Sequence, residues 1–301
     1  MTPFVVGAYA SLPEAKMQPD YYRLLASQDW ISGIEIPYPG DVAEHATWLC
    51  RQISPNWDFN TITAIPGTMQ NMGGDPLFGL ASPDDDGRVA ALQFVKRIAE
   101  GVKQMSDLSG RSLIRKVQLH SAPTKVANKE ALESSLEDIL QLDWFGAEIV
   151  VEHCDRYIPG QTPEKGFLQL SDEIEVCKKL GLKIHINWGR SVVEGRDARL
   201  ALEHINECVR SGVLAGVFFS GAGPYDTQYG YSWIDGHLPA ACDEPASLLS
   251  AEAINECSQA AIGGGAEYVG AKICVPVQST LSTRLNMIKH IYESTSKEEK
   301  K

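Results

Sequence analysis

Eight short apolar segments rich in Val, Ile and Phe recur along this chain of 301 residues, and each is followed by a stretch with helical periodicity. We interpret the apolar segments as buried strands at residues 4–9, 33–37, 61–66, 116–121, 148–153, 183–188, 216–221 and 268–274. Eight strands alternating with helices over about 250 to 300 residues predict a single α/β domain, a (β/α)8 TIM barrel. The alternative is an open doubly wound sheet, but no glycine-rich dinucleotide fingerprint follows the first strand.

No linker or change of composition divides the chain, so we expect one barrel domain over residues 1–293. The remaining tail, residues 294–301, reads STSKEEKK, and we predict that it is disordered. Two connections are longer than plain turns, at residues 66–87 after the third strand and 221–247 after the seventh. Both follow the carboxyl ends of strands, where barrel enzymes keep their active sites, so we expect these long loops to form substrate walls or lids.

The charge balance and the cysteines limit the partners and the compartment. Asp and Glu number 39 against 27 Lys and Arg, and a formal net charge of -12 repels phosphate backbones and anionic membrane surfaces. We therefore predict neither a nucleic-acid nor a membrane partner. Seven scattered cysteines without a C-x-x-C pair are typical of reduced thiols, and the N-terminus lacks the pattern of a signal peptide. Both features predict a cytoplasmic protein.

Charged and polar residues recur near the carboxyl ends of the predicted strands. Since strand side chains alternate, Glu35, His120, Glu152, His185 and Lys272 are expected to share the barrel interior. A buried charge without a partner is costly, so such residues in apolar strands point to a function. Because strands four, five and six are neighbours, we expect His120, Glu152 and His185 to lie close together. The alternative is structural: Glu35 and Glu152 would each pair with Lys272 or Arg190 only to hold the barrel mouth closed.

The stretch EIVVEHCDR, residues 148–156, contains four consecutive candidate ligands, and alternation leaves Glu152 as the strong inward one. Cys154 is poorly placed to act with His153 as a nucleophilic pair, because adjacent strand residues face opposite sides. Gly221 and Gly223 are candidates for close backbone approach to a ligand. The candidate substrate-binding residues lie at strand ends six and seven or in the loops that follow them: His185, Asn187, Trp188, Arg190, Ser220 and His237.

The sequence of residues at the eight strand ends, with IVVEHCD at the fifth, resembles that of the xylose isomerase-like barrels. These barrels are a group of sugar isomerases and epimerases. The resemblance covers essentially the whole chain as element order. It implies a divalent ion held by a Glu on strand five, an Asp on strand six, a His on strand seven and a Glu on strand eight. Glu152 matches the first position. The other positions carry His185 or Asn187, then Ser220, then Lys272, so the usual ligand set is incomplete.

Our hypothesis is a sugar isomerase/epimerase-like enzyme that acts on a carbohydrate or hydroxycarbonyl substrate by carboxylate-mediated proton transfer at the barrel mouth. Glu152 is the predicted base, Glu35 a second acid/base, and Lys272 the cation in place of the metal. His120 and His185 would orient hydroxyls or pass protons. The resemblance also implies a homo-oligomer, because related barrels often form dimers or tetramers.

Three alternatives stay open. A divalent Mn, Mg or Zn ion could be held by Glu152 and His185, with His120 or Glu35 as a further ligand. A lyase or aldolase could use Lys272 as a Schiff-base amine. A barrel that binds sugar without catalysis would explain the same missing ligands.

Overall fold

The computed structural model describes residues 2–296, and within them eight strands close into a barrel in sequence order. The strands are β1 Phe4–Val6, β2 Gly33–Pro37, β3 Asn60–Thr63, β4 Ile114–Leu119, β5 Glu148–His153, β6 Lys183–Asn187, β7 Leu214–Phe219 and β8 Tyr268–Ala271. A strand lies at each predicted position, and β2 and β5 have the predicted bounds. The predicted (β/α)8 barrel is therefore confirmed.

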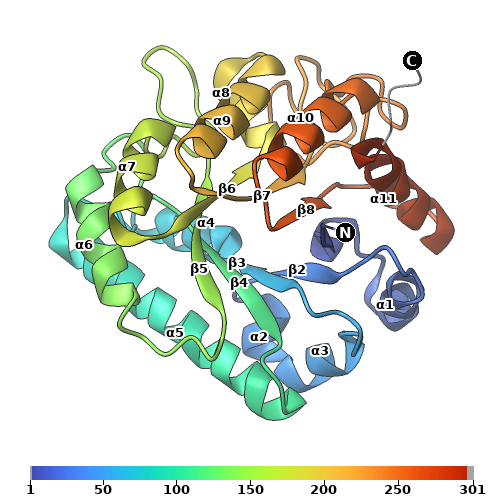
Figure 1. The fold of residues 1–301 in the computed structure, drawn as a ribbon, viewed down its shortest axis with the longest axis horizontal. Coiled ribbons are helices and arrows are strands. Elements are labelled where there is room, and N and C mark those ends of the chain that lie inside the picture. The colour runs from blue at the N-terminus through green and yellow to red at the C-terminus, as the bar shows by residue number, and fades with distance from the viewer. Residues whose placement is uncertain (1, 297–301) are drawn as a thin grey trace. The chain divides into compact units, whose positions relative to one another are not determined.

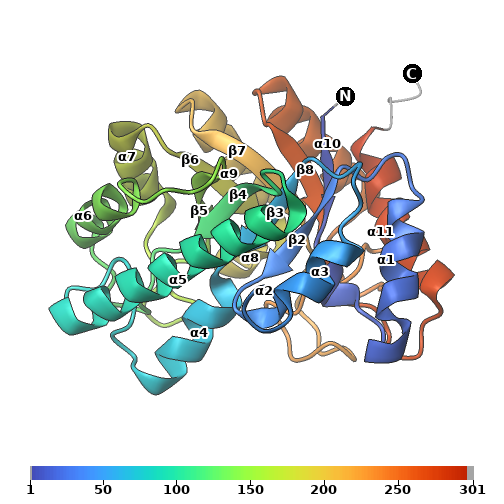
Figure 2. The ribbon, with the colours of Figure 1, turned by 90° about the horizontal axis from the view of Figure 1, so that it is seen from below.

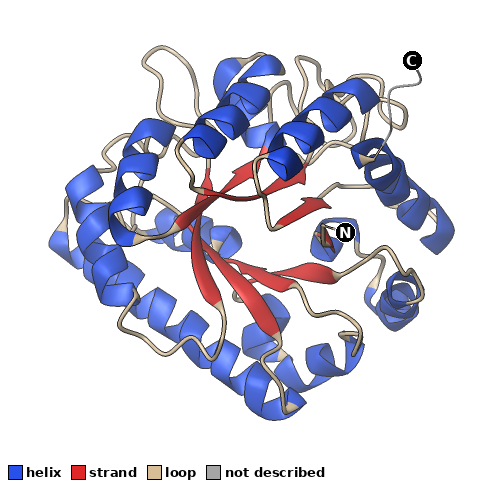
Figure 3. Ribbon diagram, in the orientation of Figure 1, coloured by secondary structure: helices blue, strands red, loops and turns tan. Residues whose placement is uncertain are grey.

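By their contacts, the described residues form two compact units, which are described separately below. The first comprises residues 35–185, and the second comprises the described residues up to 34 together with those from 186 onward. Figure 3 shows the strands of each unit with helices beside them.

The unit of residues 35–185 also contains helices. These are α2 Gly40–Glu44, α3 Ala46–Gln52, α4 Ile65–Gly74, α5 Asp85–Ser109, α6 Lys129–Ile139 and α7 Leu170–Leu180. Helices α5, α6 and α7 follow one another along β4 and β5 (Figure 1), and Figure 2 shows α5 extending to α3. Sequence signals fix their ends. Asp84 and Asn128 accept hydrogen bonds from the first turns of α5 and α6, and Gly110 ends α5 with φ 69°.

The strand register of this unit sets which side chains share the interior. Thr61 pairs with Lys116 and Lys116 with Glu148, while Thr63 pairs with Gln118. The Lys116 ammonium, which is fully buried, reaches Glu148 at the half-exposed start of β5, 2.6 Å away. This ion pair compensates the buried charge of Lys116 at the amino-terminal end of the strands.

The other unit contains α1 Gln18–Ala26, α8 Trp188–Gly195, α9 Arg199–Arg210, α10 Ala251–Gly263 and α11 Leu281–Thr295, with short 3-10 turns at Ala8–Ser11 and Ala15–Met17. Helices α8 to α11 pack in chain order, each against the next (Figure 1). Strand β1 is paired on both sides, because Val5 lies beside Gly33 of β2 and Gly270 of β8.

Some expected element boundaries were wrong. The long connection after strand three contains α4, which was missed because its sequence, IPGTMQNMGG, is rich in loop-forming residues. Pro66 is tolerated in the first turn of a helix, and Gly67 lies where a Cβ would be 2.5 Å from Phe94. Helices α2 and α3 are separated only by His45, whose φ is -137°. By contrast, the connection after β7 contains no helix or strand among its described residues.

At the carboxyl end, α11 continues through Thr295, two residues past the predicted domain boundary. The rest of the predicted disordered tail, residues 297–301, lies outside the described residues. Among residues 2–296, no helix combines the length and the apolar character needed to span a membrane.

Candidate functional site

Four polar side chains from β3 to β6 converge at the carboxyl ends of these strands, all within residues 35–185. Glu152 on β5 is at their centre and is fully buried. His120, directly after β4, places Nε2 2.6 Å from Glu152 Oε2, and the Thr63 hydroxyl at the end of β3 donates to the same oxygen over 3.2 Å. His185 Nε2 on β6 is 4.0 Å from Glu152 Oε1. The structure thus brings together the three residues that strand order predicted to be neighbours.

The two contacts to Oε2 determine how the Glu152 carboxylate is oriented. A carboxylate in a water-excluded site is costly unless donors compensate its charge, and a 2.6 Å contact to an imidazole is in the range of charge-assisted hydrogen bonds. With Oε2 held by His120 and Thr63, Oε1 is the oxygen on the side of His185. This geometry suits a carboxylate that accepts and returns a proton.

The outward residues of the same stretch have separate partners. His153 Nδ1 is 2.7 Å from Glu173 Oε2 on α7, and the Ser121 hydroxyl donates to the other Glu173 oxygen over 2.5 Å. Cys154 is fully buried. The Asp155 carboxylate accepts backbone N–H bonds from residues 164–166 at 2.9 to 3.2 Å and so holds the following loop. Strand alternation therefore separates Glu152 from its neighbours in the sequence.

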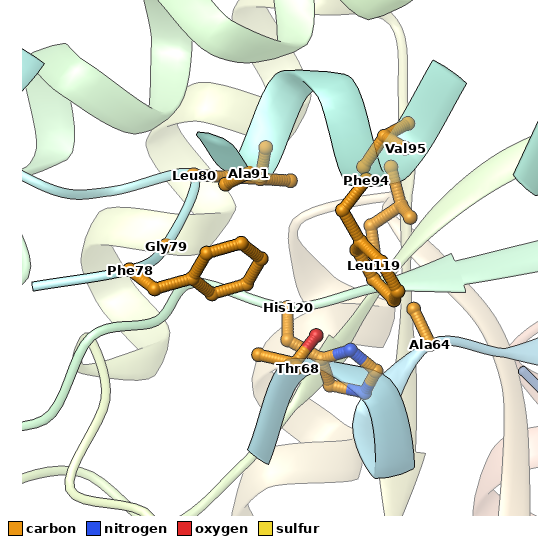
Figure 4. Close-up of a pocket in the computed structure, with 10 residues that line it drawn as sticks. All are labelled: Ala64, Thr68, Phe78, Gly79, Leu80, Ala91, Phe94, Val95, Leu119 and His120. Carbon is orange, nitrogen blue, oxygen red and sulfur yellow. The ribbon is translucent and has the colours of Figure 1, made fainter. Parts of the chain in front are cut away.

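A small cavity lies beside His120 and encloses about 10 Å³, room for about one water molecule. Figure 4 shows the His120 ring and Thr68 on one side of it, opposite Leu80 and Ala91. Phe78 and Phe94 contribute aromatic walls. The imidazole is therefore set in apolar surroundings, which strengthen its interaction with Glu152.

A second polar cluster forms within the other unit. Arg190, in the first turn of α8, is almost fully buried and places Nε 3.0 Å from Asp235 Oδ2. The other Asp235 oxygen is 3.4 Å from His237 Nδ1, which is 2.8 Å from the Ser220 hydroxyl at the end of β7. The predicted residues Arg190, Ser220 and His237 thus meet through Asp235. Sequence reasoning overlooked Asp235, although its place two residues before His237 in the long loop was a usable signal.

Three other predictions near this cluster meet a simpler explanation. Asn187 caps α8, because its Oδ1 accepts from the Arg190 backbone N–H. Trp188 is fully buried beside the Cys257 thiol of α10. Gly221 and Gly223 do approach backbone closely, but that backbone is the chain's own. A Cβ on either would lie within 2.6 Å of the carbonyl oxygen of Leu238 or Ala246.

Lys272, just after β8, is fully buried in the same unit. Its Nζ is 5.7 Å from the centroid of the Tyr9 ring and 5.9 Å from that of Phe218, within the range of cation–π contacts. Gly7 makes room for it, because a Cβ there would be 2.7 Å from Lys272 Cβ. The lysine side chain is therefore held in a fixed place rather than directed to solvent.

The residues present do not supply the ligand set of the usual divalent metal site. The strand-eight position carries the Lys272 ammonium, which repels a cation. Among the described residues, no group of three ligands with donor atoms within 4.8 Å of one another includes Glu152 or His185. Glu35 is buried on β2, opposite Thr61. The side chains at these strand ends therefore supply only part of the ligand set that the resemblance implied.

Comparison with known proteins gives one relative by sequence and one matching family model. A protein of Salmonella typhimurium (strain LT2), described as uncharacterized protein STM3670, is 30% identical over 304 residues, which cover 96% of this chain and 95% of that protein. A model of the family described as "Domain of unknown function (DUF4862)" matches residues 5–287.

Solved structures with the same fold cover nearly the whole chain. The IolI protein with a bound zinc atom matches with a TM-score of 0.62 at 12% identity, covering 98% of each chain. D-psicose 3-epimerase with D-tagatose, from Clostridium cellulolyticum H10, matches at 0.55 and 14% identity, covering 98% of this chain and 96% of that one. A xylose isomerase domain protein from Alicyclobacillus acidocaldarius matches at 0.56 and 11% identity, covering 98% of each. These likenesses confirm the xylose isomerase-like barrel as the fold.

Proposed function

Because this chain belongs to the DUF4862 family, whose description assigns no activity, we propose its function from its own side chains: a sugar isomerase or epimerase that moves a proton next to a carbonyl group. The observation that carries the proposal is the buried Glu152 carboxylate, held at Oε2 by His120 and Thr63 with His185 beside Oε1. The sugar epimerases that share the fold support it.

In the proposed reaction, Glu152 removes the proton from the carbon beside the carbonyl of a small carbohydrate or hydroxycarbonyl substrate. The C–H electron pair then forms the carbon–carbon double bond of an enediolate, and negative charge develops on the former carbonyl oxygen. For isomerisation, the hydroxyl proton on the neighbouring oxygen moves to the enediolate oxygen, and Glu152 returns its proton to the former carbonyl carbon, so that the carbonyl group now lies on the neighbouring carbon. Return to the same carbon from the opposite face gives epimerisation and needs a second acid, for which we propose Glu35.

Glu152 loses its negative charge when it accepts the proton, and this loss changes the strength of its hydrogen bond with His120. His120 Nε2 already lies 2.6 Å from Glu152 Oε2, so the side chain need not move for the transfer to begin. For the cation that the enediolate oxygen requires, we propose Lys272, on the strength of its strand-eight position in the sequence. His185, Arg190, Ser220 and His237 are proposed to contact substrate hydroxyls.

Hydrogen exchange with solvent tests the proposal across many sugars at once. The protein is incubated in D₂O with a panel of free and phosphorylated aldoses and ketoses, and deuterium on the carbon beside the carbonyl is followed by NMR. We expect exchange on at least one sugar, and at least a 100-fold loss in Glu152→Gln. The matched control is Glu173→Gln, which changes an equally buried glutamate beside a histidine.

Sugar binding without exchange by the unaltered protein would replace the enzyme proposal with a binding function. Equal exchange rates in Glu152→Gln and the unaltered protein would remove Glu152 from the mechanism. Metal analysis of protein purified without chelator belongs to the same experiment, because a stoichiometric ion lost in Glu152→Gln would replace Lys272 as the cation.

The enclosure of Lys272 between Tyr9 and Phe218 favours a second candidate function, a lyase or aldolase. A lysine amine can attack a substrate carbonyl, lose water and form an imine, which borohydride reduces to a stable adduct. Mass spectrometry of protein treated with substrate and borohydride decides between the two functions. An adduct on Lys272 favours the lyase, and deuterium exchange without an adduct favours the isomerase.

A further inference from the structure

Three potential metal ligands meet on the surface of the unit that contains α11, in a place that the proposed reaction does not use. Cys242 and Asp243 lie in the connection after β7, and His290 lies in the middle of α11. His290 Nδ1 is 2.9 Å from one Asp243 oxygen and 3.1 Å from the other, and Cys242 Sγ is 3.7 Å from Asp243 Oδ2. One ligand atom from each residue lies within 4.8 Å of the other two.

The two separations that involve Asp243 are close to those of a tetrahedral zinc site. With Zn–S near 2.3 Å and Zn–N and Zn–O near 2.0 to 2.1 Å, neighbouring ligand atoms are about 3.3 to 3.6 Å apart. The observed 3.7 Å and 2.9 Å differ from this by a few tenths of an ångström. Thiolate, imidazole and carboxylate are also the three ligand types that Zn²⁺ uses in proteins. An ion could therefore enter with small side-chain rotations.

Both segments that carry the ligands are held by their own backbone. The Asp243 and Glu244 N–H groups both donate to the Ala240 carbonyl over 2.9 Å, and the Ala241 N–H donates to Leu249. On α11, the residues Ile288 and Ile291 that flank His290 are buried, which fixes the turn of the helix that carries it. Little chain entropy is lost when an ion joins ligands that are already in place.

The surroundings favour a cation as well. Lys289, the neighbour of His290, lies 3.4 Å from Glu293, so a carboxylate already balances its positive charge. Burial raises the pKa of the nearby Tyr229 hydroxyl to about 12, and the charges of Glu244, Cys274 and Asp243 add to this effect. Asp243 and Glu244 also place two carboxylates directly after Cys242 in the chain. Cys242 is exposed and His290 is partly so, which leaves the site open to ions from solution.

We propose that Cys242, Asp243 and His290 form a zinc site, with water as the fourth ligand, that joins the connection after β7 to α11. The same connection carries Asp235 and His237, so the ion would restrain the segment that contacts Arg190 and Ser220. The inference is independent of the proposed reaction, because Glu152 and His185 take no part in it.

The test uses the full chain, freed of metal and kept in a phosphine reductant that does not bind zinc. Equilibrium dialysis against Zn²⁺ should give one bound ion, with affinity at least tenfold weaker in Cys242→Ser, Asp243→Asn and His290→Ala. Co²⁺ in place of zinc should show a thiolate-to-metal absorption band that Cys242→Ser removes and Cys274→Ser keeps. Cys242 and His290 are exposed and Asp243 is partly buried, so the Cys242 and His290 variants are expected to fold, and circular dichroism checks all three.

The molecule provides a matched control. Asp41 on α2 and His45 directly after it form another exposed pair, with Nδ1 3.0 Å from the carboxylate, but no cysteine belongs to a ligand group with them among the described residues. His45→Ala should therefore leave zinc uptake unchanged. The proposal is overturned if the unaltered protein takes up no stoichiometric zinc, if His290→Ala binds as tightly as the unaltered protein, or if Glu152→Gln abolishes the uptake.

Discussion

His120 Nε2 and Glu152 Oε2 lie 2.6 Å apart, and both side chains are completely shielded from solvent. The pair joins the ends of two neighbouring parallel strands, and Thr63 from a third strand donates to the same carboxylate oxygen. Such a buried pair contributes little net stability compared with an apolar pair of equal size, but loss of one member is costly for the other. The stability of this part of the barrel is therefore linked to the group that we propose as the proton carrier.

The first prediction separates these two effects. His120→Ala leaves the Glu152 carboxylate buried with one donor fewer and should lower the free energy of unfolding by about 3 kcal/mol. Glu152→Gln keeps an oxygen that His120 and Thr63 can contact and should cost only about 1 kcal/mol while abolishing exchange. Urea unfolding measures both. If His120→Ala lowers the free energy of unfolding no more than Glu152→Gln does, the unpaired charge of Glu152 adds no penalty of its own.

The second prediction concerns Gln118, two residues before His120 on β4. It is fully buried, and neither its Oε1 nor its Nε2 has a hydrogen-bond partner among the described residues. An unsatisfied buried amide costs about 1 to 3 kcal/mol, so Gln118→Met should raise the free energy of unfolding by about 1 kcal/mol. If Gln118 binds a substrate hydroxyl, the same variant should raise KM tenfold or more. A fall in stability with unchanged KM would contradict both parts.

The third prediction concerns the connection after β7. Asp235→Ala leaves the Arg190 guanidinium buried without the carboxylate 3.0 Å away, which should cost about 3 kcal/mol. Because Asp235 and His237 fasten the connection to α8 and β7, limited proteolysis should cut residues 221–250 sooner in this variant. The control is Asp226→Ala in the same connection, whose carboxylate accepts an exposed backbone bond from Ser232. Equal cleavage rates in the two variants would reject the role of Asp235.

The fourth prediction is a loss of stability at alkaline pH. Burial raises the pKa of the Cys257 thiol from 9.0 to about 12 and that of the Tyr21 hydroxyl from 10.0 to about 12. Above pH 9 the unfolded chain releases these protons while the folded chain keeps them, so the free energy of unfolding falls as pH rises toward 12. Each group contributes a slope of about 1 kcal/mol per pH unit within its window.

Cys257→Ala should make this decline shallower between pH 9 and 12, as chemical denaturation at several pH values would show. A matched substitution of the half-buried Cys50, whose pKa is raised less by burial, should change the slope less. A steeper decline in Cys257→Ala would show that another group controls alkaline unfolding.

The fold was largely predictable because it depends on periodicity. Buried parallel strands need continuous apolar segments and their covering helices need apolar spacing of three and four, and both patterns are visible in a linear sequence. Helix α4 escaped because Pro66, Gly67 and Gly74 are loop formers by local preference. Packing of Gly67 against Phe94 overrides that preference, and such a contact joins residues 27 positions apart, counted from their numbers.

The sequence by itself also determined which strand residues point inward, because side chains alternate at every step along a strand. That rule selected Glu152 from EHCD and placed His120 and His185 beside it on the neighbouring strands. Only the tertiary structure decided that Thr63 donates to Glu152 and that Asp235 joins Arg190 to His237. Threonine is common in any strand and carries no signal of its own, and a loop without periodicity gives no rule for where its side chains point. Those contacts depend on the path of the chain in space, which local sequence preferences do not specify.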